Sequence, residues 1–470
     1  MSGHPVLGLL DESAARHPDR AVLRDAAAVT TAAELRDRVE RRATEWSARG
    51  AERGDVLLVV GVRTAELPVC LLAAWRLGLV PALSEHGPDA RLDALGRRTG
   101  ARWRFDVDSG VLSETGHPSS PLPLGTSHVL FTSGTTGEPA AVAVGAEPLE
   151  TAVAWYCDAF APGPGDRFSM LSGLGHDPLL RDIIMPLASG AELAIPAADA
   201  LRDPRSILTA LREGVTVLHA TPSLVEFALG SLEPGTRFPD LRLVVLGGER
   251  PRAETLRLLR AATDAVVVNA YGSTETPQIV AARVIEPGDG PLLGLVGRGI
   301  GGAELLLGRE TPSDFRERVG CGDDEVVVRS RSLALGYLGD HDSRPRFVDD
   351  PLGEPGWRAY LTGDRGELVG GGIAVVGRID RELAVNGHRL HPTEIESPAR
   401  AIPGVFDAVA RVEQGELGSI VVLSVALEPD AEVRSRDVRA ALRRVLPAWA
   451  VPTRIEVAEL ALTANGKRAL

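Results

Sequence analysis

The chain has 470 residues, more than one ordinary domain needs, which predicts a large body with a smaller appended domain. Its 64 acidic residues exceed the 51 basic ones by 13, which disfavours a nucleic-acid partner or an anionic membrane surface. The apolar runs are too short to cross a bilayer, no secretory signal opens the chain, and the three cysteines lie far apart. We therefore expect a cytoplasmic protein with no membrane span, no structural zinc site and no disulfide framework.

Helices and strands alternate through the first half of the chain. Helical periodicity over residues 32–49 precedes an apolar strand at 55–62, and the alternation continues to Leu246. Such alternation is typical of an α/β fold in which helices pack on mainly parallel sheets. Short β-rich segments follow at 325–329 and 373–376, so we expect the later part of the large body to be richer in strands.

After Gly377 the pattern changes to that of a small α+β unit. A pair of strands leads into a helix, and a strand at 419–427 precedes a helix at 433–446. We therefore expect two domains, a large N-terminal core over residues 1–379 and a small C-terminal domain over residues 380–470.

Residues 129–137, VLFTSGTTG, combine an apolar strand with a loop dense in hydroxyls and glycines. Glycines let backbone N–H groups approach oxygen atoms, and Ser and Thr add donors, so this loop can wrap a polyphosphate. It lacks the lysine of the GxxxxGK[ST] pattern. On its own, a loop of this composition is more often a plain turn.

Two further clusters carry residues suited to a nucleotide. Residues 269–275, NAYGSTE, directly follow an expected strand, where α/β sheets place ligands. Tyr271 offers an aromatic face for a base, and Glu275 offers hard oxygen ligands for magnesium. In residues 360–364, YLTGD, Asp364 can accept hydrogen bonds from two ribose hydroxyls. The alternatives are a strand cap with a solvated Glu and an ordinary turn-forming Asp.

Lys467 is the only lysine of the chain, and the other 50 basic residues are arginines. A composition that replaces Lys by Arg wherever charge suffices suggests that the surviving Lys serves chemistry that a guanidinium cannot supply. The alternative is a chance survivor near the C-terminus.

Taken together, the clusters resemble the ordered motifs of the adenylate-forming superfamily, which includes acyl-CoA synthetases and the adenylation domains of nonribosomal peptide synthetases. Two of the matching segments, 28–35 and 75–82, are degenerate versions of the family's early motifs. The matching segments are 28–35, 75–82, 130–139, 269–275, 360–364, 377–396 (GRIDRELAVNGHRLHPTEIE) and 462–467 (LTANGK). The resemblance covers essentially the whole chain.

The resemblance implies that a carboxylate attacks the α-phosphate of ATP, releasing pyrophosphate, and that a thiol then takes the acyl group. Lys467, Glu275 and Thr136 would be catalytic, with Glu275 also the Mg²⁺ ligand, and Asp380 would be the hinge of a mobile small domain. The residues that would bind ATP are Thr132, Ser133, Gly134, Thr135, Thr136, Gly248, Asn269, Tyr271, Gly272, Thr274, Asp364 and Arg378.

Residues 170–196 resemble amino-acid adenylation domains, and most closely those of α-aminoadipate reductases. In amino-acid-activating members, an Asp at the position of Asp177 pairs with the substrate ammonium, as a buried cation requires. Lys467 would close the carboxylate end of the pocket. The residues that would line the pocket are Asp177, Pro178, Arg181, His219, Val245, Gly247, Ala270, Gln278 and Ile279.

Arg181 bears most on the substrate side chain, because a guanidinium inside a pocket can grip a carboxylate. We therefore expect an α-amino acid with an acidic or otherwise strongly polar side chain, with α-aminoadipate, glutamate and aspartate as leading candidates. Two alternatives stay open: Arg181 could form a salt bridge to Asp182, and His219 could be a core histidine without a substrate contact.

The chain departs from the family pattern at Ala140, because Pro139 is normally followed by a lysine that contacts phosphate. No carrier segment follows Lys467, so we expect a separate phosphopantetheinylated carrier protein as the acceptor, in natural-product biosynthesis. The alternatives are an acid–CoA ligase, an amide-forming ligase and a non-catalytic adenylation-like binding protein. The resemblance also admits a small accessory activator protein as a partner.

Overall fold

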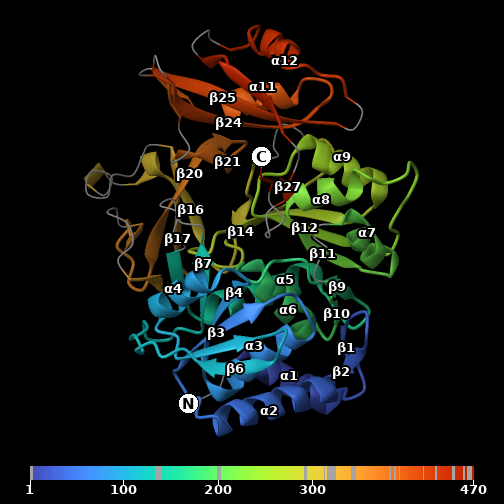
Figure 1. The fold of residues 1–470 in the computed structure, drawn as a ribbon, viewed down its shortest axis with the longest axis vertical. Helices are drawn as coiled ribbons and strands as arrows, with labels where there is room; N and C mark the ends of the chain where they lie inside the picture. Colours follow the sequence, from blue (N-terminus) through green and yellow to red (C-terminus); the bar gives the residue numbers. More distant parts are fainter. Residues whose placement is uncertain are drawn as a thin grey trace.

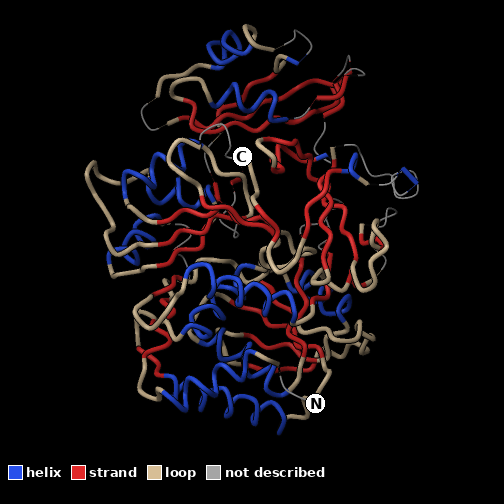
Figure 2. The backbone as a smooth tube through the Cα atoms, turned by 180° about the vertical axis from the view of Figure 1, so that it is seen from behind, coloured by secondary structure: helices blue, strands red, loops and turns tan. Residues whose placement is uncertain are grey.

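The computed structural model describes residues 4–132, 140–197, 203–289, 294–311, 313–314, 324–339, 346–379, 383–385, 388–390, 392–415, 418–428, 431–446, 450–458, 461–462 and 468–469. Figure 1 and Figure 2 show a stack in which the C-terminal elements lie at the end of the molecule opposite helices α1 and α2.

Two mainly parallel sheets form the large body. The first has the strand order β15-β14-β13-β12-β11-β9-β10-β1-β2, and the second has the order β18-β8-β7-β4-β3-β5-β6. The strands of the first sheet are β1 (Ala21–Arg24), β2 (Val29–Thr31), β9 (Arg167–Ser169), β10 (Glu192–Ala194), β11 (Val217–Ala220), β12 (Leu243–Gly247), β13 (Val266–Tyr271), β14 (Ala281–Val284) and β15 (Arg298–Gly299). Those of the second are β3 (Val56–Gly61), β4 (Val80–Glu85), β5 (Trp103–Asp106), β6 (Val111–Glu114), β7 (His128–Thr132), β8 (Ala140–Val144) and β18 (Gly336–Leu338).

Helices fill the layer between the sheets and cover their outer faces. The helices of the body are α1 (Val6–Arg16), α2 (Ala32–Ala48), α3 (Glu66–Leu77), α4 (Asp89–Thr99), α5 (Glu147–Phe160), α6 (Pro178–Ser189), α7 (Pro204–Arg212), α8 (Pro222–Leu229) and α9 (Ala253–Ala262). One core joins Val59 of β3 and Val245 of β12 through side chains of α3, α5 and α6. On the other face of the first sheet, Val244 and Leu246 pack with α7, α8 and α9.

Local sequence signals explain where these helices begin and end. The helix expected at 32–49 is α2, and a capping box between Thr31 and Glu34 fixes its start. Helix α3 ends at Gly78, which has φ +81°, a left-handed conformation that glycine adopts without strain. The strand expected at 55–62 is β3, and all of its residues are buried.

The later part of the body is rich in strands, as expected. An antiparallel sheet has the order β16-β17-β20-β19, and β21 pairs with β20. Its strands are β16 (Glu304–Leu307), β17 (Glu325–Ser330), β19 (Phe347–Asp349), β20 (Arg358–Val369) and β21 (Gly372–Arg378).

The C-terminal elements form a small α+β unit with its own core. Helices α11 (Pro392–Arg400) and α12 (Ser435–Leu442) pack on the sheet β24 (Val405–Gly415), β25 (Gly418–Leu427) and β26 (Arg454–Val457). The two-stranded pairs are β22 (Leu383–Val385) with β23 (His388–Leu390), and β27 (Ala461–Leu462) with β28 (Arg468–Ala469). An ion pair links this unit to α9, since Arg252 Nη1 lies 3.3 Å from Asp407 Oδ1.

Among the helices described, none is both long and apolar enough to cross a membrane.

Candidate functional site

The candidate site lies where the parallel strands β11, β12 and β13 end next to one another. His219 of β11 is in register with Val245 of β12, and Gly247 of β12 is in register with Ala270 of β13. Strand β13 runs on through Asn269 to Tyr271, so part of the cluster expected just after the strand forms its end instead. Carboxyl ends of parallel strands are where such sheets bind ligands.

Tyr271 and Asp364 come together from positions far apart in the sequence. The Tyr271 hydroxyl donates to Asp364 Oδ2 at 2.5 Å, and burial together with this carboxylate raises the pKa of Tyr271 well above its ordinary value. Arg378 lies opposite Asp364 in the β20–β21 pair and donates to its Oδ1 at 3.3 Å. The three residues therefore form one polar group beside the end of β13.

A second guanidinium, which the sequence analysis did not single out, approaches the same turn. At Gly363, φ is +71°, and a Cβ there would lie 2.8 Å from Arg346 Nη1 and 3.1 Å from Arg378 Nη2. The glycine thus lets two cations lie close to the backbone next to Asp364. Its N–H donates to the carboxylate of Glu325, also unassigned from the sequence, at 2.9 Å.

Glu275 is buried and bonded to Tyr337, which is in turn bonded to Tyr360. Its Oε1 accepts from the Tyr337 hydroxyl at 2.9 Å, and the Tyr337 and Tyr360 hydroxyls lie 3.1 Å apart. Burial, and then the charge of Glu275, raises the pKa of both tyrosines. Tyr337 was missed from the sequence because strand β18, which carries it, reaches the site by pairing with β8.

Other expected nucleotide contacts border this group. The Asn269 side chain donates to the Leu295 carbonyl at 2.8 Å, and Gly248 turns the chain with φ +78° just after β12. Thr132 ends β7 and pairs with Ala140 of β8. Several expected residues lie outside the described ones: Ser133, Gly134, Thr135, Thr136, Asp380 and Lys467.

The loop after β13 carries Gly272 and Thr274 and folds back tightly. A Cβ at Gly272 would lie 3.1 Å from the carbonyl oxygens of both Thr276 and Gln278. The Ser273 N–H donates to Thr276 Oγ1 at 2.9 Å. Any side chain at position 272 would therefore crowd the loop that positions Gln278.

Asp177 and Gln278 form a buried pair at the start of α6. Gln278 Nε2 donates to Asp177 Oδ1 at 2.6 Å and to its carbonyl at 3.1 Å, and the Gln278 N–H donates to Oδ2. Gln278 has φ +67°, an uncommon conformation for a residue other than glycine. Burial raises the pKa of Asp177 to about 7, although the bonds from Gln278 and the charge of Arg181 oppose the rise.

Arg181 belongs to the same group. Its Nη1 donates to the Gln278 carbonyl at 3.2 Å, and its side chain is buried. Among the described residues, no carboxylate forms an ion pair with it, so the structure does not support the alternative salt bridge to Asp182.

His219 lies in the core, as the alternative reading of the sequence expected. Its Nε2 is 3.0 Å from the Tyr156 hydroxyl and its Nδ1 is 2.7 Å from Asp182 Oδ1, so both ring nitrogens have partners within the protein. Its ring also meets Tyr156 and Phe168 edge to face, and burial lowers its pKa. These contacts disfavour a direct contact between His219 and a substrate.

The remaining expected pocket positions lie on α6, on strands β12 and β13 and next to Gln278 in the sequence. Pro178 begins α6, while Val245, Ala270 and Ile279 are buried in the core between the sheets. Gly247 is partly exposed at the end of β12. Three of the nine expected pocket residues are therefore joined by hydrogen bonds, and three of the apolar ones belong to the core between the sheets.

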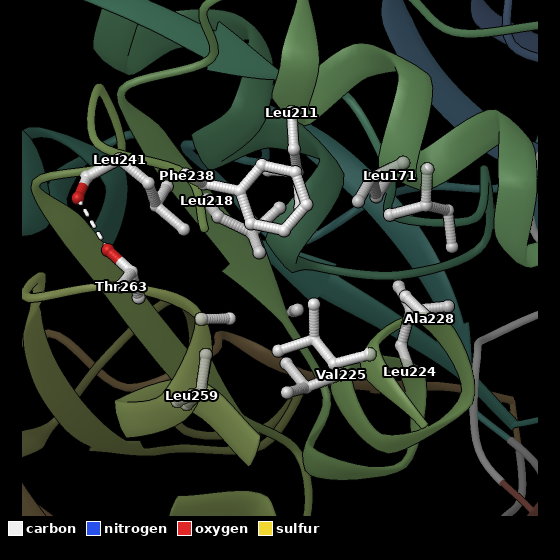
Figure 3. A pocket seen from close by; sticks show the side chains of 14 residues that line it. Leu171, Leu211, Leu218, Leu224, Val225, Ala228, Phe238, Leu241, Leu259 and Thr263 are labelled. Atoms are coloured by element: carbon white, nitrogen blue, oxygen red, sulfur yellow. Dashed lines mark hydrogen bonds between the residues drawn. The ribbon is translucent and has the colours of Figure 1, made fainter. Parts of the chain in front are cut away.

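Figure 3 shows a different cavity, of about 10 Å³, among side chains of α7, α8 and α9. Leu218 and Phe238 are among its lining residues, and its polar edge is a bond from Thr263 Oγ1 to the Leu241 carbonyl. The cavity is about the size of one water molecule and apolar, so it is a packing gap on the sheet face opposite Asp177.

Magnesium would require oxygen ligands, and buried Glu275 supplies a carboxylate beside the Tyr271–Asp364 group. The described residues contain no cluster of three or more His, Cys, Asp or Glu side chains suited to a metal. Such a site fits an ion that completes its shell with substrate phosphates and water rather than with a protein cage.

Comparisons with known proteins identify the family of the chain. The family model described as AMP-binding enzyme matches residues 10–109 and 93–338, and that described as AMP-binding enzyme C-terminal domain matches 394–467. The chain is 27% identical over 493 residues to tyrocidine synthase 3 of Brevibacillus parabrevis, covering 98% of this chain and 7% of that protein. It is 30% identical over 504 residues to phenyloxazoline synthase MbtB of Mycolicibacterium paratuberculosis, covering 99% and 42%. The chain thus spans less than half the length of these curated relatives.

Solved structures share the fold over the whole chain. A four-domain nonribosomal peptide synthetase bound to AMP and glycine superposes with a TM-score of 0.82 at 21% identity, covering 99% of this chain and 36% of that one. ATP-bound MatB from Rhodopseudomonas palustris gives 0.81 at 20% identity, covering 99% and 97%. IdnL7 gives 0.79 at 25% identity, covering 100% and 97%.

Proposed function

Because the chain belongs to the AMP-binding enzyme family, within the adenylate-forming superfamily that contains the adenylation domains of nonribosomal peptide synthetases, we propose that it activates an α-amino acid as the aminoacyl adenylate. The family is a class of ligases, and its members use ATP. The proposed substrate has an acidic or polar side chain. The proposed acceptor is the phosphopantetheine thiol of a separate carrier protein. The cytoplasmic location expected from the sequence stays a prediction.

The observation that carries the amino-acid assignment is the buried carboxyl of Asp177. A carboxylate with so little solvent is unfavourable without a cation beside it, and the ammonium of an amino acid is such a cation. Gln278 directs two N–H donors at the carboxylate and so fixes its position before substrate binds. Arg181, bonded to the Gln278 carbonyl, brings polar character to the side-chain end of the pocket.

The nucleotide roles follow from the second group of residues. Tyr271 would stack on adenine, with Asn269 and Gly248 at its border, while Asp364 would accept hydrogen bonds from the ribose hydroxyls. Arg378 and Arg346, which lie close to Gly363, would then provide positive charge beside the ribose. Glu275 would hold Mg²⁺, which when bound neutralises phosphate charge.

Lys467 would act at the other side of the reacting centre. Its ammonium can follow charge that develops between the attacking carboxylate and the α-phosphate. The proposed division into residues 1–379 and 380–470, with Asp380 as the hinge, would let the small domain bring Lys467 in for the first half-reaction and withdraw it for the second.

Amino-acid-dependent exchange of labelled pyrophosphate into ATP, with Mg²⁺, tests the proposal. The panel comprises proteinogenic amino acids, α-aminoadipate, β-amino acids and the matching α-hydroxy acids, which lack the ammonium. Exchange with one polar amino acid and none with its hydroxy analogue supports the assignment. Equal exchange with the hydroxy acid refutes the role of Asp177, and exchange with aryl or dicarboxylic acids only would make the chain an acid ligase of another kind.

The acceptor is tested separately with the activated substrate in hand. Mass spectrometry of phosphopantetheinylated carrier proteins should show an added aminoacyl mass. Transfer to free coenzyme A or to an amine instead would identify one of the two alternative ligase activities. Folded protein that binds ATP without any exchange would favour a non-catalytic binding protein.

A further inference from the structure

Two buried polar atoms in the group formed by Asp177, Arg181 and Gln278 have no hydrogen-bond partner within the described part of the protein, and they are of opposite kind. Arg181 Nε is a donor and Gln278 Oε1 is an acceptor, on side chains of residues that are 3% and 6% exposed. The two residues are bonded to each other through Arg181 Nη1 and the Gln278 carbonyl. Buried polar groups in native proteins are almost always satisfied, so a pair left open in one place calls for an explanation.

The orientation of the Gln278 amide is fixed by its neighbours. Its Nε2 lies within bonding distance of two acceptors, Asp177 Oδ1 and the Asp177 carbonyl. The reversed amide would place an oxygen against both of them, which is unfavourable. The Gln278 Oε1 is therefore the atom that can accept a hydrogen bond from a ligand. Likewise Arg181 uses Nη1 within the protein and leaves its Nε–H without a partner.

A ligand that satisfies both atoms must carry an acceptor for Arg181 and a donor for Gln278. A side-chain carboxylate has acceptors only, so it would satisfy Arg181 and set oxygen against oxygen at Gln278. A hydrocarbon side chain would leave both atoms buried and unpaired. A primary carboxamide or a hydroxyl has both capacities and no charge.

We propose that the pocket selects an amino acid with a neutral side chain that both donates and accepts a hydrogen bond, a carboxamide or a hydroxyl, through Arg181 Nε and Gln278 Oε1. The inference rests on the proposed amino-acid activation and narrows it, because it disfavours the acidic candidates. Specificity of this kind is strong, since a site built to bond a polar group leaves its own groups unpaired when an isostere lacks that group.

Pyrophosphate exchange with isosteric pairs tests the proposal on the unsubstituted protein. The pairs are glutamine with glutamate, asparagine with aspartate, and threonine with valine. The first two pairs test a carboxamide, and the third tests a hydroxyl. We expect one amide or hydroxyl amino acid to exceed its partner by at least about 100-fold in kcat/KM. If an acid is preferred over its amide, or if no amide or hydroxyl amino acid exceeds its partner, the proposal is overturned while amino-acid activation stands. No exchange with any amino acid, together with exchange by another carboxylic acid, overturns the proposed function as well.

Arg181→Lys keeps the positive charge and removes Nε. It therefore distinguishes a hydrogen bond from Nε to a neutral side chain from the attraction of a positive charge to a carboxylate. The preferred substrate should lose at least about tenfold in kcat/KM relative to its isostere, whereas a carboxylate-binding role would retain most of the preference. Arg16→Lys, on an exposed face of α1, is the matched control. Thermal shifts with the non-hydrolysable aminoacyl sulfamoyl adenosines of glutamine and glutamate give a reading that needs no turnover. A larger shift with the glutamate compound counts against the proposal.

Discussion

Asp177→Asn probes the buried carboxyl on which the amino-acid assignment depends. Burial raises the pKa of Asp177 from 3.8 to about 7. The folded protein therefore holds this proton more tightly than the unfolded chain does, and the free energy of unfolding falls as pH rises from about 4 to 7. A rise of about three units corresponds to about 4 kcal/mol above pH 7. Asparagine does not ionise, so it removes this penalty.

The substitution also has a cost that does not depend on pH. An amide can accept a hydrogen bond through its oxygen alone, so one of the two donors of Gln278 loses its partner, which costs about 1–3 kcal/mol. Relative to the unsubstituted protein, Asp177→Asn should thus be of similar stability at pH 5, where roughly 1.7 kcal/mol of the ionisation penalty is already present and offsets the lost hydrogen bond, and should gain about 2.5 kcal/mol between pH 5 and pH 8. Urea unfolding at the two pH values measures the difference, with Asp158→Asn at an exposed position of α5 as the control.

Ionisation of Asp177 should also make substrate binding stronger as pH rises, whereas it makes the folded protein less stable. A substrate ammonium favours the ionised form of Asp177, so KM for the amino acid should fall as pH rises from 6 to 8 in the unsubstituted protein. In Asp177→Asn this dependence should disappear, and loss of the charge partner should reduce kcat/KM by about a hundredfold to several thousandfold, or 3–5 kcal/mol. Pyrophosphate exchange measures both. An unchanged KM in the variant, or a stability difference that does not vary with pH, would refute the reasoning.

Three further substitutions address the nucleotide site and the small domain. Lys467→Ala should lower the rate of exchange by about a hundredfold or more, about 3 kcal/mol of barrier, and a rate within threefold of the original would argue for a binding protein. Tyr271→Phe keeps the ring and removes the hydroxyl that donates to Asp364, so KM for ATP should rise about tenfold while KM for the amino acid stays constant; equal changes in both would mean a general distortion. Asp407→Asn weakens the ion pairs of this carboxylate with Arg252 of the large body and with Arg400 of the small unit, so limited proteolysis between the two parts should become faster. Arg400→Gln, which leaves the Arg252 pair in place, is the control, and equal cleavage rates in the two variants would show that the Arg252 pair does not hold the parts together.

The fold was largely predictable because its elements carry local signals. The period of apolar residues in 32–49 and the Thr31 capping box specify α2 without any distant contact. Strand β3 is apolar throughout, as a strand of a parallel sheet covered on both faces must be. The helix expected at 433–446 is shorter in the structure, where α12 spans Ser435–Leu442, since amphipathic periodicity outlasts the hydrogen-bonded helix.

The site was predictable in its residue types but only partly in its contacts. Strand ends and turns identified Tyr271, Glu275 and Asp364, yet the bond between Tyr271 and Asp364 joins residues 93 positions apart. Tyr337 carried no signal of its own, because its role depends on β18 pairing with β8 across nearly 200 residues. Contacts of this kind are set by sheet topology, which a single sequence does not contain.

Arg181 and His219 show why residue type alone does not separate a substrate contact from a core residue. Both are polar residues in apolar surroundings, and each had an alternative reading within the protein. The alternative for Arg181 was an ion pair with Asp182, but consecutive residues of a helix point in different directions. Asp182 instead reaches His219 and completes its hydrogen bonds, while Arg181 reaches Gln278 and keeps one donor free. Helix α6 therefore separates a closed polar network from an open one, and the proposed pocket is built on the open one.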